Sequence, residues 1–271
     1  MQATPIFWNF CRTFTVLVLL ALASPVGAQD LEPRRWSHLP VGMNVAGVGG
    51  SWLDGDIFLD PVLLAEDVTF ETKALGGSYV RAFDWFGRTG RIDLVLPYAA
   101  ARWEGFVDGV YTSRRQRGLL DPRIRFSWNL VGAPALRGRE FMAYRQQSAV
   151  NTTVGVGAEI TLPLGEYDET KLLNLGRNRW VVRPQLGVLH QRGKWQFELT
   201  GSVFIFGEND EFWNGNLLKD DPLWFLQGHL IYSFKPGWWG AVSGGFAHGG
   251  RSKVNGEQKP NDGRTNYYAV S

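Results

Sequence analysis

From about Val41 onward the chain repeats one unit of roughly ten residues, in which apolar side chains alternate with polar or small ones and aromatic residues stand near the ends. Segment 224–234 shows the pattern best, because Trp224, Leu226 and Leu230 share one face while Gln227 and His229 share the other. A period of two predicts a β-strand, and about ten tilted residues cross the hydrocarbon core of a bilayer. The pattern favours a transmembrane β-barrel with alternating lipid-facing and lumen-facing side chains.

Two further segments alternate in the same way. In segment 123–130 the polar face carries Arg123, Arg125 and Asn129, and in segment 150–162 it carries Thr153 and Glu159. A soluble β-sandwich would alternate too, so no single strand decides between the two folds. The connections decide, because a barrel threaded through a membrane has short turns at one rim and long loops at the other.

The predicted connections follow that rule with one exception. Short turns are expected at 86–90, 191–194 and 235–237, and long polar loops at 53–67, 104–120, 165–178, 207–221 and 249–263. The exception is segment 132–148, which is long but falls on the side of the short turns. We interpret it as a periplasmic segment with one helical turn near 141–146.

The alternation predicts an all-β fold, an antiparallel transmembrane β-barrel with about ten strands in this chain. The expected strands are 41–53, 67–85, 91–103, 121–132, 149–163, 179–190, 195–206, 223–234, 238–248 and 264–271. The last is short, and an unpaired strand edge in lipid is very costly. The chain is therefore expected to stop before the barrel closes, lacking one hairpin of a twelve-stranded barrel.

The N-terminus reads as an export signal. Residues 1–28 contain Arg12, an apolar run and the small-residue site Val26-Gly27-Ala28, which indicates a Sec-type secretory signal. Residues 29–40 are expected to form a periplasmic N-terminal segment, and 41–271 the outer-membrane barrel. The only cysteine, Cys11, lies in the signal, so the mature chain is expected to hold no disulfide.

Composition narrows the classes of protein. The formal net charge is +2, which indicates neither a nucleic acid nor a strongly anionic partner. Mean hydropathy is −0.16, and outside the signal no apolar run reaches the length of a membrane-spanning helix. Aromatic residues gather beside both the short turns and the long loops, which is typical of the girdles of a barrel.

Several motifs resemble those of a known protein family. The run Thr161-Leu-Pro-Leu-Gly-Glu-Tyr-Asp168, followed by Asn174-Leu-Gly-Arg-Asn-Arg-Trp180, resembles the hallmark of the outer-membrane family named for the MetA-pathway of phenol degradation. The turns around Asp54-Gly-Asp56, Asp60-Pro61 and Leu120-Asp121-Pro122-Arg123 resemble its other recurring turns. The likeness covers about 40–271. It implies a transporter-like barrel associated with uptake of aromatic compounds and brings no catalytic residues.

Enzyme and metal chemistry find little support in the residues. Of the four histidines only His229 points clearly into the lumen, and a count of register places Thr200 opposite it, which is more typical of lumen packing than of catalysis. Asp54, Asp56 and Asp60 could attract Ca²⁺, but they lack the ligand spacing of an EF-hand. We therefore expect no catalytic residues, no cofactor and no metal.

The sequence thus predicts a Gram-negative outer-membrane barrel for passive passage or binding of small, hydrophobic or aromatic solutes. The alternative is a structural or adhesive barrel with a plugged lumen and its function in extracellular loops. Expected partners are outer-membrane lipid, lipopolysaccharide near the basic run 114–117, and the small solute. The residues expected to line the lumen share an inward phase. Three of them, Arg125, Glu159 and Arg183, are expected to form a charged row. The full set is Arg123, Arg125, Asn129, Glu159, Arg183, Gln185, Glu198, Gln227 and His229.

Overall fold

The computed structural model describes residues 31–57, 65–107, 110–235, 237–258 and 266–270. One large antiparallel sheet dominates them, with the strand order β1-β2-β3-β5-β6-β7-β8-β11-β12-β15 and with β4 paired to β3. Its strands are β1 (Asn44–Ile57), β2 (Ala65–Trp85), β3 (Arg88–Val107), β4 (Val110–Leu119), β5 (Arg123–Val131), β6 (Val150–Thr161), β7 (Val181–Arg192), β8 (Trp195–Phe206), β11 (Leu223–Lys235), β12 (Trp238–Gly249) and β15 (Asn266–Val270).

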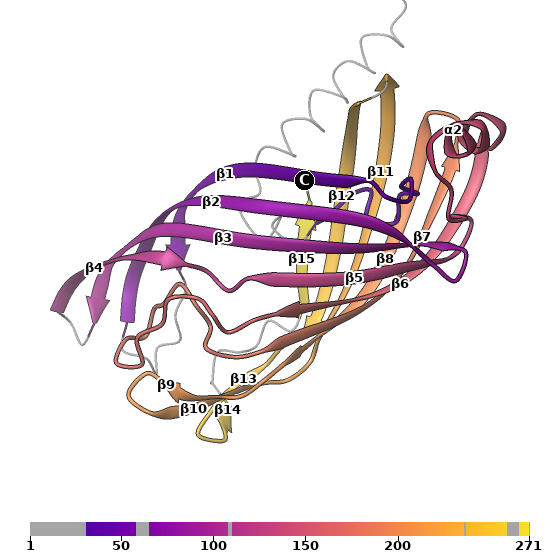
Figure 1. Ribbon diagram of the computed structural model, residues 1–271. Coiled ribbons are helices and arrows are strands. Elements are labelled where there is room, and N and C mark those ends of the chain that lie inside the picture. Colours follow the sequence, from indigo (N-terminus) through magenta and orange to yellow (C-terminus); the bar gives the residue numbers. More distant parts are fainter. Residues whose placement is uncertain (1–30, 58–64, 108–109, 236, 259–265, 271) are drawn as a thin grey trace, which may run out of the picture.

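The large sheet curls into a half-barrel (Figure 1). Strands β1 to β3 form one wall, β11 and β12 form the opposite wall, and the strands between them bend from one to the other. Sequential strands pair as antiparallel neighbours almost throughout, so each side chain on a strand faces either the inside or the outside of the curl.

The two ends of the half-barrel differ in their connections. Tight turns at Gly87, Gly193 and Gly237 have positive φ angles, a conformation that glycine adopts without steric cost. The same end carries the helix α2 (Gly138–Gln147), which confirms the helical turn expected there. The opposite end carries a small separate sheet of β9 (Asn209–Phe212), β10 (Asn216–Asp220), β13 (Ser252–Val254) and β14 (Glu257–Gln258) (Figure 1).

The expected strands are confirmed within a few residues, whereas three expected loops contain strands: 207–221 and 249–263 form the small sheet, and 104–120 extends the large one. Segment 104–120 is mostly a long hairpin, because β3 runs on to Val107 and β4 begins at Val110. Side-chain pairs hold this extension together: the Arg114 guanidinium lies 5.9 Å from the centre of the Trp103 ring. Polar composition alone favours a loop here, but the register keeps cross-strand side chains of β3 and β4 in contact, and such pairs stabilise a sheet.

The two faces of the large sheet have opposite characters. Outward side chains are apolar and exposed, as Leu226 (48% exposed) and Leu186 (59%) show. Inward side chains are polar and buried, as Gln227 (2%) and Glu159 (4%) show. This is the reverse of a soluble protein, in which buried side chains are mostly apolar. It is the arrangement of a sheet surrounded by lipid and filled with polar groups. Within the described ranges, no helix is both long and apolar enough to cross a membrane.

Candidate functional site inside the half-barrel

A row of alternating charges crosses the inner face. The strand register places Arg125 of β5 opposite Glu159 of β6, and Glu159 opposite Arg183 of β7, as the sequence count predicted. The Nε of Arg125 donates a hydrogen bond of 2.7 Å to the Glu159 carboxylate. Because each buried charge faces one of opposite sign, the row can exist inside the barrel without an uncompensated ion.

The row continues onto β3 through a residue that the sequence analysis did not select. Asp93 lies opposite Arg125 in the register and accepts hydrogen bonds from Arg91 Nε (2.7 Å) and Arg35 Nη1 (2.9 Å). Its inward phase could have been read from the alternation in β3. Arg183, at the other end, donates to Ser202 Oγ at 3.1 Å and lies over the Phe204 ring at 4.2 Å.

The inner face is covered by residues 31–41, which we call the N-terminal segment. Trp36 is the most buried of its side chains, at 1% exposure. Its indole lies over Gly155 and Gly187, which are direct partners on β6 and β7. A Cβ at Gly187 would lie 1.9 Å from the indole nitrogen, so only glycine leaves room for the ring. Trp36 Nε1 also donates to Thr200 Oγ1 at 2.8 Å.

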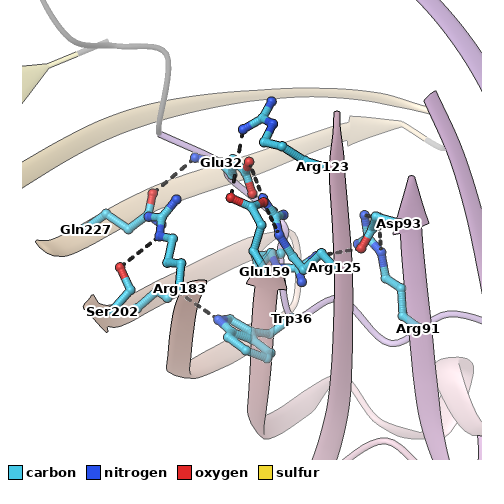
Figure 2. A network of polar contacts seen from close by, with 12 residues as sticks. Glu32, Trp36, Arg91, Asp93, Arg123, Arg125, Glu159, Arg183, Ser202 and Gln227 are labelled. Atoms are coloured by element: carbon cyan, nitrogen blue, oxygen red, sulfur yellow. Dashed lines mark hydrogen bonds and ion pairs between the residues drawn. The ribbon is translucent and has the colours of Figure 1, made fainter. Parts of the chain in front are cut away.

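Carboxylates and amides of the strands hold the backbone of this segment. Glu198 accepts the amide protons of Arg35 (3.0 Å) and Trp36 (3.3 Å), and Gln227 Oε1 accepts that of Glu32 (3.1 Å). Figure 2 shows Glu32 between Gln227 on one side and Arg125 on the other. Two of the predicted lumen residues therefore bind the chain itself rather than lining an empty path.

Glu32 joins the N-terminal segment to the charge row. Its carboxylate accepts a hydrogen bond of 2.7 Å from Arg125 Nη2. Burial opposes the charged form of Glu32, but the positive charge and the hydrogen bonds of Arg125 outweigh it and lower the pKa of Glu32 to about 2. The segment is thus held by an ionised group at any physiological pH.

The remaining predicted residues are also inward, and of these Arg123 contacts the row. Asn129 and Gln185 are buried, at 7% and 5% exposure, and Arg123 forms a long ion pair of 4.0 Å with Glu159. His229 lies opposite Glu198 and Ser243, so the count that placed Thr200 opposite it was wrong by one pleat pair. His229 Nε2 contacts Gln227 Oε1 at 3.2 Å, and the Glu198 carboxylate accepts hydrogen bonds from backbone amides. The described contacts assemble no activated nucleophile.

The hallmark motif folds a loop above this site. The carboxylate of Asp121 accepts the amide protons of Gly165 (2.9 Å) and Arg177 (2.8 Å), and so joins both ends of the loop to the turn before β5. Asn174 closes the loop internally, because its side chain hydrogen-bonds to the backbone of Asp168 in both directions. In the structure the motif therefore has a clear architectural role.

Metal binding finds no further support in the described ranges. They contain no group of three or more histidine, cysteine or acidic residues that could hold an ion. Asp60 of the Asp-rich turn lies outside the described residues.

The fold and the site define a membrane-type β-barrel with a charged and partly filled interior. The family model described as "Putative MetA-pathway of phenol degradation" matches residues 58–271, and the chain belongs to this family. A crystal structure of an outer membrane channel from Pseudomonas putida F1 is similar to it, with a TM-score of 0.66 and 21% identity, over 89% of this chain and 85% of that chain. No curated protein matches the sequence.

Proposed function

We propose that this protein is an outer-membrane channel of a Gram-negative bacterium for the passive passage of small hydrophobic or aromatic solutes. One observation carries the proposal: the sheet is apolar outside and polar inside, so lipid can surround it while a solute crosses its interior. Family membership and the similar fold of a bacterial outer membrane channel support the same reading. The expected signal at 1–28 supports export to that membrane.

The solute path runs beside the charge row and the N-terminal segment. We assign to its wall the inward residues Arg123, Arg125, Asn129, Glu159, Arg183, Gln185, Glu198, Gln227 and His229. Since Trp36 and Glu32 occupy part of the inner face, the N-terminal segment narrows the path. We assign no reaction and no cofactor to the protein.

We also propose lipopolysaccharide as a partner of the long hairpin. Arg115 and Arg117 are exposed on β4, where guanidinium groups can bind phosphates in a bidentate way. Arg114 differs from them, because it donates to Asn174 in the loop at 3.3 Å. Loss of lipopolysaccharide binding in Arg115→Gln with Arg117→Gln, but not in Arg192→Gln on the rim of the short turns, tests this assignment.

Conductance tests the main proposal. Purified protein in planar bilayers should give small, stable single-channel steps, and liposomes containing it should admit benzenesulfonate, which is permanently ionised and crosses lipid slowly, faster than protein-free liposomes do. The N-terminal segment on the inner face favours one alternative, a structural barrel whose interior is plugged and whose function lies in its loops. Complete absence of conductance and of solute entry, both in this chain and in a variant with the segment displaced, would establish that alternative.

A further inference from the structure

A chamber of about 500 Å³ lies on the inner face, against the N-terminal segment. Its wall includes Glu32, Arg34 and Arg35 of the segment, Arg123 of β5 and Trp239 of β12. A volume of this size is in the range of ligand sites in proteins. The chamber adjoins the charge row. The ion pairs of the row do not balance all the positive charge that lines the chamber.

The described residues that line the chamber are unbalanced by two positive charges. Five of them are arginines and three are carboxylates, namely Arg34, Arg35, Arg91, Arg123 and Arg125 against Glu32, Asp93 and Glu159. All three carboxylates are already paired: Glu32 and Glu159 bind Arg125, and Asp93 binds Arg91 and Arg35. An excess of buried guanidinium charge in a cavity is a site for an anion.

One of these arginines has accessible hydrogen-bonding capacity. The side chain of Arg123 is 33% exposed, and among the described residues its only ion pair is the distant one with Glu159, at 4.0 Å. The side chain of Arg35 is 2% exposed and donates from Nη1 to Asp93, while its Nε and Nη2 are fully buried without a hydrogen-bond partner among the described residues, so Arg35 adds positive charge behind the wall but no accessible donor. Guanidinium groups with free donors bind carboxylates through two parallel hydrogen bonds.

The rest of the chamber wall indicates which organic group the bound anion carries. Trp239 presents its ring to the chamber, and the Arg34 guanidinium lies 5.3 Å from the centre of that ring. Burial lowers the pKa of Arg34, and the positive charge of Arg145 lowers it further, although Glu198 opposes both. Val80 adds apolar surface to the wall. A flat ring would therefore find an aromatic face beside the positive charge.

We propose that this chamber binds an aromatic carboxylate, with the carboxylate on Arg123, in the positive field to which the buried Arg35 contributes, and the ring against Trp239. The proposal rests on the channel function above and names the substrate class of the same interior. It also gives the accessible donors of the half-buried Arg123 a partner.

Equilibrium binding tests the proposal without requiring transport. The purified full chain in detergent is titrated at neutral pH with benzoate, and with benzamide as its neutral isostere, by calorimetry. Benzoate should bind at least about tenfold more tightly than benzamide, because it alone supplies the charge that the arginines lack. Equal affinity for the two compounds, or no binding of either, would overturn the proposal with no variant needed.

Matched variants then locate the site. Arg123→Gln should weaken benzoate binding about tenfold and leave benzamide unchanged, while the same charge removed at the exposed Arg192 should have no effect. Trp239→Leu should weaken benzoate binding about three- to tenfold, whereas Trp238→Leu, on the outer face of the same strand, should not. Equal losses in Arg123→Gln and Arg192→Gln would show general surface charge rather than a chamber.

Conductance measured on the same samples separates the two proposals. Benzoate preference without conductance would leave the chamber standing and overturn the channel. Conductance without benzoate preference would support the channel and overturn the proposed binding site in the chamber.

Discussion

The substitution Gly187→Ala should displace the N-terminal segment from the inner face of the sheet and so widen the channel. A Cβ at this position would lie 1.9 Å from the Trp36 indole nitrogen, whereas ordinary contacts begin at 3.4 Å. The ring would have to move by more than an ångström, away from the sheet face that Gly155 and Gly187 form together. The displacement also breaks the hydrogen bond of 2.8 Å from Trp36 to Thr200.

The energy involved is large enough to measure. Trp36 is 1% exposed, and removal of a buried tryptophan side chain costs about 3–5 kcal/mol. Even about 3 kcal/mol changes an equilibrium by roughly a hundredfold. A segment that is almost always seated in the unaltered protein should therefore be displaced in a measurable fraction of Gly187→Ala molecules, and mean conductance should rise.

Two assays follow this change. Planar bilayers report conductance, and a thiol probe reports the segment directly: in a chain without Cys11, Ser37→Cys should react slowly with a small maleimide and much faster once Gly187→Ala is added. Gly201→Ala is the matched control, because a Cβ there meets nothing within 4 Å. Unchanged labelling and conductance in correctly assembled Gly187→Ala would refute the claim that Trp36 holds the N-terminal segment in place by packing on Gly187.

Three further predictions concern the barrel itself. Glu159→Gln should make the channel more anion-selective in bilayers, since it leaves Arg125 and Arg183 less compensated, and adding Arg183→Gln should partly reverse the shift; unchanged selectivity would exclude the row as a constriction. Leu186→Arg should impair assembly by about 2–4 kcal/mol, seen as lost heat-shifted gel mobility, while Leu186→Met should assemble normally; equal assembly would place Leu186 away from lipid. A tag at Asn214 should be reachable on intact cells and one at Gly193 hidden, and the reverse result would invert the topology.

Much of the barrel could be predicted from the sequence, because a two-residue period is a local property. Each strand carries its own inside and outside, so the burial of Gln227 beside the exposed Leu226 followed from neighbouring letters alone. The row Arg125, Glu159 and Arg183 was also predictable, since antiparallel register can be counted across a connection when the strands on both sides are recognised. The same counting failed at His229, where one pleat pair of error gave it the wrong partner.

Only the tertiary structure showed what occupies the interior. Residues 31–41 have no strand period, and nothing local indicates that Trp36 packs over Gly155 and Gly187, which lie more than a hundred residues later. These glycines read as ordinary small residues in strands, and their purpose appears only once β6 and β7 are paired and the segment lies across them. A strand's alternation follows from backbone geometry, which each residue shares with its neighbours. The filling of a barrel depends on shape and charge matched between distant parts of the chain, and only the folded molecule brings those parts together.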